Sequence, residues 1–304
     1  MEAKLFGFLA ETSIHPGSGQ DAGLVDLPVA REAATDYPVV VGSAFKGALR
    51  DSIFWRCYAP KYEAHIAACT NPDDTQIQKT AEDEARKFAD QRADKYFGTS
   101  ANGGEILVSD LRVLMLPIRS LTASYYWITC PHVIERLVRD EQRTGAAATD
   151  PNYGGLTKFH FLGNFEQPPK IFLEERQFER AGPLPTGLIE LLGKYIPHPS
   201  TRARLNAQCV VLADDDFAWF ARYGLAVTAR NVLNRDTKTS KNLWYEETIP
   251  PDALFYCLLA GRTAGVLSKL TAELLEHPYL QVGGNETVGQ GWFAVTEARR
   301  PEGK

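Results

Sequence analysis

Residues 39–58, VVVGSAFKGALRDSIFWRCY, decide how the rest of the chain is organised. The run opens with three β-branched valines, which favour a buried strand, and Gly42 and Ser43 then predict a turn with a serine that caps the following helix. Lys46 and Arg50 lie four residues apart in that helix, so both project from one side of its first turns. Two cations beside the free N–H groups of a helix start predict a site that holds a phosphate group.

The ligand of this site is expected to be a nucleotide backbone or another phosphorylated molecule. No side chain in the stretch is of a kind and placement that reads base identity, so contacts to phosphate are the natural use of its charges. The alternative is an ordinary surface helix on which Lys46 and Arg50 are merely solvated. Other parts of the chain decide between these interpretations.

Composition describes a globular chain with a local basic site. The 304 residues are 44% hydrophobic, enough for a sizeable core, and no apolar run approaches the roughly 20 residues of a membrane span, so we expect a cytoplasmic protein without a membrane partner. The net charge of −5 argues against a protein that coats nucleic acid non-specifically. A second basic patch is expected in residues 230–241, where Arg230, Arg235, Lys238 and Lys241 face only Asp236.

Hydrophobic patterning predicts an α+β fold, and 304 residues are enough for one elaborated domain or two small ones; we expect a single domain over residues 1–304. Strand-like runs alternate irregularly with helical ones, and residues 60–98 are polar and helix-prone, which indicates a helical insertion. Residues 230–247 combine two strand-like runs with a polar turn and predict a long hairpin with a basic tip. Near the end of the chain, glycines in residues 283–291 allow close approach of the backbone to a ligand.

The loop after the first predicted strand carries two notable polar residues. His15 stands at the strand end before Pro-Gly, and Asp26 stands in the sequence Val-Asp-Leu-Pro. Proline after leucine favours extended backbone, and the apolar neighbours of Asp26 are expected to pin this acid in place.

Four motifs together resemble one family. They are His15-Pro-Gly-Ser-Gly with Val25-Asp-Leu-Pro28, Gly42-Ser-Ala-Phe-Lys-Gly-Ala-Leu-Arg50, Leu243-Trp-Tyr-Glu-Glu247, and Gly283-Gly-Asn-Glu-Thr-Val-Gly-Gln-Gly291. The chain is similar to the repeated backbone subunit of Cmr-type (type III-B) CRISPR effector complexes, within the RAMP superfamily. The likeness spans nearly the whole chain, and residues 62–96 are its least assignable part.

The resemblance implies a ferredoxin-like (RRM-like) core with the hairpin as a thumb. It also implies that several copies stack along one CRISPR guide RNA beside other Cmr-type subunits, and that paired target RNA is cut at regular intervals. Base pairing would supply the sequence specificity. The residues expected to bind RNA are Gly42, Ser43, Lys46, Arg50, Arg230, Arg235, Lys238, Gly283, Gly284 and Gln290.

On the same resemblance, the chain is an endoribonuclease and Asp26 is its catalytic residue. Asp26 acts either directly on the 2′-hydroxyl or by holding a divalent cation, with Mg²⁺ as the expected ion and its ligands left open. Further catalytic candidates are His15, Tyr245 and Glu246.

Two other classes of function compete with this hypothesis. A non-catalytic RNA-binding filament subunit would keep Lys46, Arg50 and the hairpin while making Asp26 dispensable. A metabolic enzyme would use the glycine-rich loops for a phosphorylated substrate.

Overall fold

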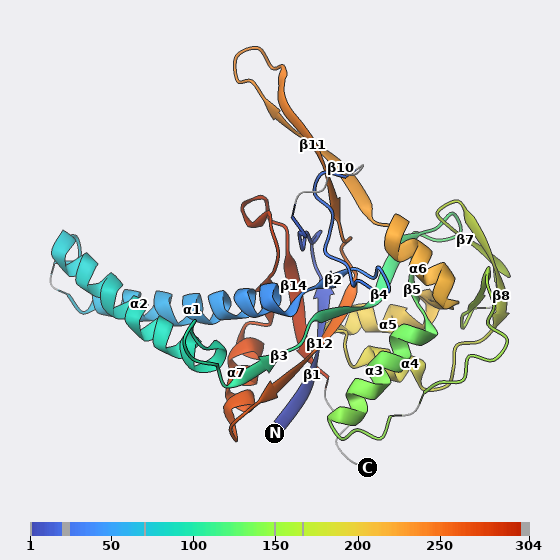
Figure 1. Ribbon diagram of the computed structural model, residues 1–304, viewed down its shortest axis with the longest axis horizontal. Helices are drawn as coiled ribbons and strands as arrows, with labels where there is room; N and C mark the ends of the chain where they lie inside the picture. The colour runs from blue at the N-terminus through green and yellow to red at the C-terminus, as the bar shows by residue number, and fades with distance from the viewer. Residues whose placement is uncertain (1, 20–24, 70, 149, 166, 299–304) are drawn as a thin grey trace.

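The computed structural model describes residues 2–19, 25–69, 71–148, 150–165 and 167–298, and in these the chain folds as a mixed α+β protein (Figure 1). The strands are β1 (Glu2–Ala10), β2 (Val39–Val40), β3 (Ile106–Val108), β4 (Leu111–Arg119), β5 (Tyr125–Thr129), β6 (His160–Leu162), β7 (Lys170–Leu173), β8 (Arg176–Gly182), β9 (Cys209–Leu212), β10 (Ala226–Leu233), β11 (Ser240–Thr248), β12 (Leu254–Gly261), β13 (Tyr279–Gln281) and β14 (Trp292–Glu297). The α-helices are α1 (Gly42–Ala67), α2 (Thr75–Phe97), α3 (Pro131–Arg143), α4 (Leu188–Gly193), α5 (Pro199–Gln208), α6 (Asp214–Tyr223) and α7 (Val266–Glu276). The predicted α+β class is confirmed.

Within the described residues, one sheet of 12 strands holds the core together. Its order is β13-β14-β1-β12-β4-β5-β9-β6-β8-β7, with β2 paired to β4 and β3 paired to β12. Neighbouring strands are antiparallel except in the pairs β5–β9 and β6–β8. The central strands β1 and β12 are almost wholly buried, because their side chains alternate between two covered faces.

The start of α1 differs from its prediction. The helix begins at Gly42, two residues earlier than a cap at Ser43 requires, and its N-cap residue is Val41. The Gly42 N–H instead donates to Asp110 Oδ1 at 2.7 Å, from the segment just before β4. One of the helix-start N–H groups that were expected to face a phosphate is therefore already occupied by a carboxylate.

α1 and α2 form an antiparallel helical arm that projects from the body (Figure 1). The boundary at residue 60 that the sequence predicted falls inside α1, which continues through Pro60 to Ala67, and α2 covers most of the remaining residues up to 98. The two helices pack along a ridge of buried alanines at every fourth position of α2, namely Ala81, Ala85, Ala89 and Ala93. Alanines at this spacing lie on one face and let two helices approach closely.

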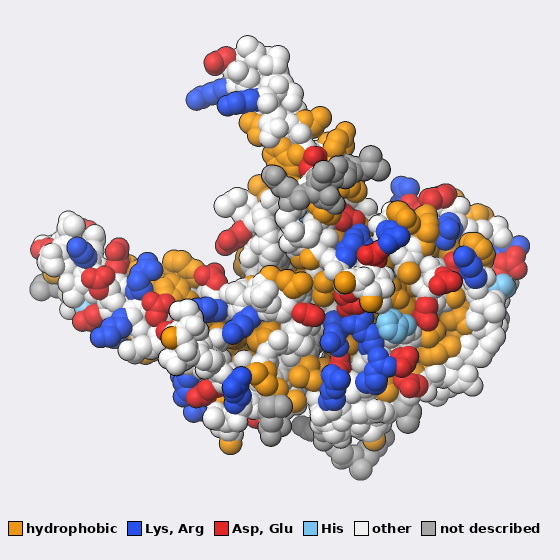
Figure 2. All heavy atoms as spheres, in the orientation of Figure 1, with side chains coloured by type: hydrophobic (Ala, Val, Ile, Leu, Met, Phe, Trp, Pro, Cys, Tyr) orange, Lys and Arg blue, Asp and Glu red, His pale blue; other side chains and the backbone are white. Residues whose placement is uncertain are grey.

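β10 and β11 form a separate two-stranded hairpin that projects upward from the body in Figure 1, away from the helical arm. Its shaft exposes hydrophobic side chains, and basic side chains gather at its tip (Figure 2). The base of β11 is buried from Glu246 to Thr248, so the hairpin is anchored at one end only. The two strands span residues 226–248, where the sequence predicted a hairpin over residues 230–247.

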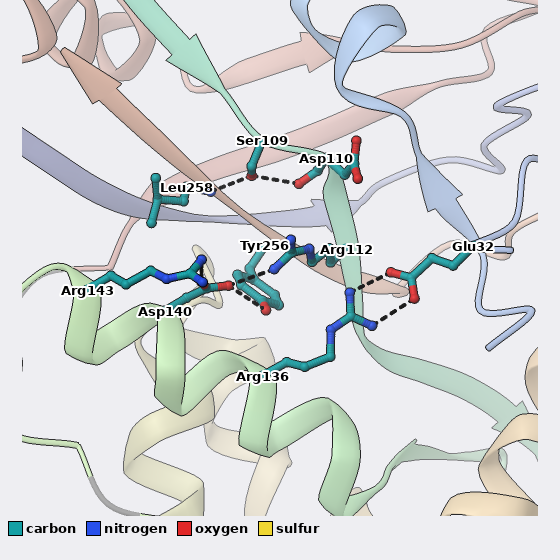
Figure 3. A network of polar contacts seen from close by, with 9 residues as sticks. All are labelled: Glu32, Ser109, Asp110, Arg112, Arg136, Asp140, Arg143, Tyr256 and Leu258. Atoms are coloured by element: carbon teal, nitrogen blue, oxygen red, sulfur yellow. Dashed lines mark hydrogen bonds and ion pairs between the residues drawn. The ribbon is translucent and has the colours of Figure 1, made fainter. Parts of the chain in front are cut away.

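A polar network fastens α3 to the sheet (Figure 3). The buried carboxylate of Asp140 accepts hydrogen bonds from Arg112 at 2.9 Å and from Arg143 at 2.7 Å. The Tyr256 hydroxyl also donates to it, at 3.1 Å, and burial raises the pKa of Tyr256 to about 12, so this proton stays in place. One buried carboxylate therefore joins α3, β4 and β12.

The long connection between β1 and β2 is held against the body at several points. Its residues pair in isolated bridges with the base of β11 and with each other, and Glu32 accepts two hydrogen bonds from Arg136 of α3, at 2.8 and 2.6 Å (Figure 3).

In the described part of the chain, no helix is both long and apolar enough to cross a membrane.

Candidate active site at the base of the hairpin

Three segments that are distant in sequence meet at the base of the β10–β11 hairpin. They are the loop after β1, the end of β11, and the glycine-rich loop before β14. The four predicted catalytic residues lie on the first two of these segments, and Gly283, Gly284 and Gln290 lie on the third. We call this region the hairpin-base site.

Asp26 is exposed, and its carboxylate is held by the backbone of β11. The Tyr245 N–H donates to Asp26 Oδ2 at 2.7 Å. The neighbouring residue Leu27 continues this pairing, because its N–H donates to the Tyr245 carbonyl at 3.1 Å and its carbonyl accepts from Glu247 at 3.0 Å. The sequence led us to expect that the flanking residues hold this acid in place. They do so through a short strand-like pairing with β11 and not by apolar packing alone.

His15 is buried beside the glycine-rich loop. Its Nδ1 lies 2.8 Å from the carbonyl oxygen of Glu247 and 3.8 Å from Glu246 Oε1. Its own carbonyl accepts from the Gly284 N–H at 3.0 Å. Gly283 has a φ of +95°, and a Cβ added there would meet the His15 carbonyl oxygen at 2.6 Å, so glycine is required at this position.

Glu246 lies at the centre of the site and is 1% exposed. Its Oε2 is 2.6 Å from Arg230 Nε, off the line of an ideal N–H···O bond, and its Oε1 accepts from Asn285 Nδ2. Arg230 pairs with Trp244 in the hairpin, so it lies diagonal to Glu246 on the same face. Asn285 also donates to Gln290 Oε1 at 2.9 Å. The charge of Glu246 is thus compensated by fixed partners, which suits a positioning residue better than one that exchanges protons.

Tyr245 projects from the opposite face of β11 to Glu246, because successive residues of a strand alternate. Its side chain is 45% exposed. The structure therefore places Tyr245 and Asp26 at the surface, and His15 and Glu246 beneath them.

Glu247 and Arg31 belong to the support of the site, although the sequence did not single them out for a role. Glu247 Oε2 accepts from the Val29 N–H at 3.0 Å, and its Oε1 accepts from Arg31 at 2.6 Å. Arg31 also donates to the carbonyl of Ala221, at 2.6 Å, at the end of α6. The sequence signal that could have identified Glu247 is its place as the second glutamate of the Trp-Tyr-Glu-Glu motif, directly after the predicted catalytic residue Glu246.

The side chains of the hairpin-base site supply few ligands for a divalent cation. Among the described residues, no group of three or more His, Cys, Asp or Glu side chains could hold a metal ion. Among the residues that the structure describes, Asp26 Oδ1 has no hydrogen-bond partner, whereas both carboxylate oxygens of Glu246 have partners. Mg²⁺ is commonly bound by one or two carboxylates plus substrate phosphates and water. Asp26 fits such a shared arrangement but not a cage built by the protein alone.

The second predicted site, at the start of α1, is a separate cavity. Ser43, Lys46 and Arg50 line it together with residues 97–100 and two aspartates of α2. Within the described chain Lys46 has no ion pair, but Arg50 is paired with Asp94 and donates to the Gly98 carbonyl at 2.7 Å. The two cations are therefore not equivalent, which their spacing of four residues did not indicate.

Arg235 and Lys238 lie far along the hairpin and do not join either site. Both are exposed at its tip, and Lys238 adopts a φ of +57° in the turn. Of the predicted basic residues in this segment, only Arg230 reaches the hairpin-base site.

Comparisons with known proteins agree with this architecture. The sequence pattern of the RAMP superfamily matches residues 8–294. A protein of Pyrococcus furiosus named CRISPR system Cmr endoribonuclease Cmr4 is 30% identical over 312 residues, which cover 97% of this chain and 96% of that protein.

Solved structures show the same likeness. The crystal structure of oligomeric Cmr4 from Pyrococcus furiosus aligns with a TM-score of 0.68 and 27% identity over 98% of each chain. A chain in the cryo-EM structure of the type III-B Cmr-beta bound to cognate target RNA aligns with a TM-score of 0.69 over 98% of each chain, and at 18% identity this likeness shows the fold alone. Since the superfamily pattern covers nearly the whole chain and a full-length relative shares 30% of its residues, the chain belongs to the RAMP superfamily.

Proposed function

We propose that this chain is the guide-RNA-binding backbone subunit of a type III-B CRISPR effector complex and that it cleaves target RNA paired with the guide. The observation that carries the proposal is the fixed carboxylate of Asp26, exposed beside the hairpin and held at 2.7 Å by the Tyr245 N–H. A relative that matches along its whole length is named as a Cmr endoribonuclease. The expected partners are the guide RNA, the target RNA, further copies of this chain and other Cmr-type subunits.

The finer description of the fold belongs to the same proposal. The sheet would contain a ferredoxin-like core within one domain, and the β10–β11 hairpin would act as a thumb that enters the guide–target duplex. Its exposed hydrophobic shaft and basic tip suit contact with bases and with phosphates, respectively. Such a chain would work in the cytoplasm, together with its RNA partners.

In the proposed reaction, Asp26 acts on the ribose next to the scissile phosphate. Its carboxylate takes the proton of the 2′-hydroxyl, and the resulting oxygen attacks the phosphorus. The bond from phosphorus to the 5′ oxygen breaks, which leaves a 2′,3′-cyclic phosphate. The departing 5′ oxygen takes a proton from water and becomes a 5′-hydroxyl, and Asp26 returns its proton to the hydroxide that remains. Tyr245 lies at the same surface as Asp26. His15 and Glu246 orient the chain segments that carry Asp26 and Tyr245.

A divalent cation is the second form of this proposal. Asp26 would be its protein ligand, shared with RNA phosphates, and the ion would stabilise negative charge near the scissile bond. Substitution of Asp26 tests both forms of the proposal, because in each of them cleavage depends on the Asp26 carboxylate.

The test is cleavage of a guide-complementary RNA by the reconstituted complex, with wild type and with Asp26→Asn. We expect Asp26→Asn to assemble and bind RNA normally and to cut about 10² to 10⁴ times more slowly. Mapping the ends of the RNA products identifies the attacking group, since a cyclic phosphate requires attack by the 2′-hydroxyl. Repeating the assay with EDTA and then with Mg²⁺ separates direct action from metal-assisted action.

Normal cutting by Asp26→Asn would contradict the catalytic assignment and favour the non-catalytic filament subunit. Absence of bound RNA after reconstitution would instead favour an enzyme that uses a phosphorylated metabolite. We propose that the guide binds at the cavity at the start of α1, where Lys46 has no ion pair with any described residue.

A further inference from the structure

The cavity between the start of α1 and the end of α2 contains opposing charges. Its volume is 640 Å³, and Lys46 and Arg50 of α1 face Asp90 and Asp94 of α2 across it. The hydroxyl-bearing residues Ser43, Thr99 and Ser100 complete much of its lining. A cavity with hydroxyl donors and a free ammonium group suits a phosphate, but two carboxylates in the same wall oppose one.

The aspartates divide the two cations into one that is free and one that is held. Lys46 has no ion pair within the described residues, whereas the Arg50 guanidinium is bound by Asp94 and by the Gly98 carbonyl. Asp90, one turn before Asp94, likewise has no ion pair in the described chain and lines the same cavity. A phosphate entering the cavity therefore meets one available cation and an uncompensated carboxylate.

We propose that Asp94 sets the RNA affinity of this cavity by withholding Arg50 from the phosphate. The inference rests on the proposed function, in which an RNA backbone is the ligand at Lys46. Arg50 and Asp94 have side chains that are each 35% exposed, so water and salt weaken their attraction and a phosphate can compete for the guanidinium. Asp94 is thus an affinity-setting residue rather than a contact to RNA.

The inference predicts a gain of binding when an acidic residue is neutralised. In Asp94→Asn the amide keeps the size of the side chain and loses the charge, so Arg50 becomes a second phosphate contact. Binding of RNA should become about two- to fivefold tighter. The dependence of affinity on salt should also steepen, by a slope of about 0.7 for one added contact on a single strand. Damage to the fold would lower affinity, so it cannot imitate this result.

The experiment measures fluorescence anisotropy of a short labelled single-stranded RNA with the full chain at several salt concentrations. Asp83→Asn is the matched control, because it makes the same change in net charge at an exposed position of α2 outside the cavity lining. Arg50→Ala combined with Asp94→Asn should erase the gain. Asp94→Ser is measured as a second variant in case the amide disturbs the helix, with thermal melting to verify the fold of each protein.

The outcomes separate this inference from the proposed function. Tighter, more salt-dependent binding by Asp94→Asn but not by Asp83→Asn supports the inference. Unchanged or weaker binding by both Asp94 variants, while Lys46→Ala still weakens binding, overturns the inference and leaves the cavity as an RNA site. Unchanged binding by Lys46→Ala would overturn the assignment of guide binding to the cavity itself.

Discussion

The hairpin-base site and the cavity at the start of α1 use charged residues in contrasting ways. At the hairpin base, Glu246 is buried and its charge is compensated by Arg230 and Asn285, beneath an exposed Asp26. In the cavity the charges are half-exposed, the Arg50–Asp94 pair is open to water, and Lys46 has no ion pair among the described residues. A buried carboxylate with a partner at each oxygen stays in place, whereas exposed pairs exchange partners easily.

Under the proposed function, this difference separates the residues that act in cleavage from those that bind RNA. A cleavage site needs atoms held in place, and its supporting charges contribute most when they never meet the ligand. A site that holds a nucleic-acid backbone needs charges that the ligand can reach. Four substitutions test the contrast, from the largest expected effect to the smallest.

Glu246→Ala should have the largest effect on stability. It leaves Arg230 without its anion at the buried base of the hairpin, and loss of one partner of such a pair costs about 2 to 4 kcal/mol of unfolding free energy. The measurement is chemical denaturation followed by circular dichroism. Glu286→Ala, at an exposed position of the glycine-rich loop, is the control and should change stability by about 0.5 kcal/mol or less. Equal losses of unfolding free energy in Glu246→Ala and Glu286→Ala would show that the contacts of Glu246 do not stabilise the fold more than an exposed residue does.

Gly283→Ala should come next, and Gly289→Ala is its matched control. Both glycines have positive φ, but only at residue 283 would the new Cβ meet the His15 carbonyl oxygen. Backbone strain of this kind costs about 1 to 3 kcal/mol, and the clash should add to it at residue 283. Target cleavage should fall for Gly283→Ala and remain near wild type for Gly289→Ala. A similar loss in both variants would remove the argument that this contact positions His15.

Lys46→Ala should weaken RNA binding without changing stability or the spacing of cleavage. Loss of one phosphate contact lowers the salt slope by about 0.7 on a single strand and should weaken affinity about two- to fivefold. Lys61→Ala, further along α1 and exposed, controls for the change in net charge. Binding titrations at several salt concentrations distinguish the two lysines. The contrast between the sites fails if Lys46→Ala slows cleavage at saturating RNA.

The double substitution Arg235→Ala/Lys238→Ala at the hairpin tip should have the smallest effect. Both residues are exposed, so the free energy of unfolding should change by about 0.5 kcal/mol or less. If the tip contacts phosphates, the salt dependence of duplex binding decreases while binding of single-stranded RNA stays unchanged. A large loss of stability would mean that the tip packs against the body, contrary to the projecting hairpin of Figure 1.

The sequence allowed good prediction where local patterns dominate. The alternating runs around a polar turn predicted the β10–β11 hairpin, and the polar helix-prone run predicted α2. The continuity of α1 through Pro60 was missed, because residues 60–98 were expected to form a helical insertion of their own. The signal for a longer α1 is the four-residue spacing of alanines in α2, which packs one helix against the other along its length.

Prediction failed where partners are distant in sequence. Ser43 looked like a cap, but the Gly42 N–H is bound by Asp110, which lies 68 residues later. Arg50 looked equivalent to Lys46 until folding brought Asp94 to it. Spacing along one helix identifies which side chains share a face, but it cannot say which of them another element will neutralise.

Asp26 is also mechanically part of the hairpin. Leu27 bridges to Glu246 in parallel register, and hydrogen bonds on both sides of that bridge join the loop to β11. If Asp26 acts as proposed, a hairpin deflected by a poorly seated duplex would move the carboxylate away from the ribose, and a fully seated duplex would bring it back. The backbone register would then make cutting depend on how the substrate lies.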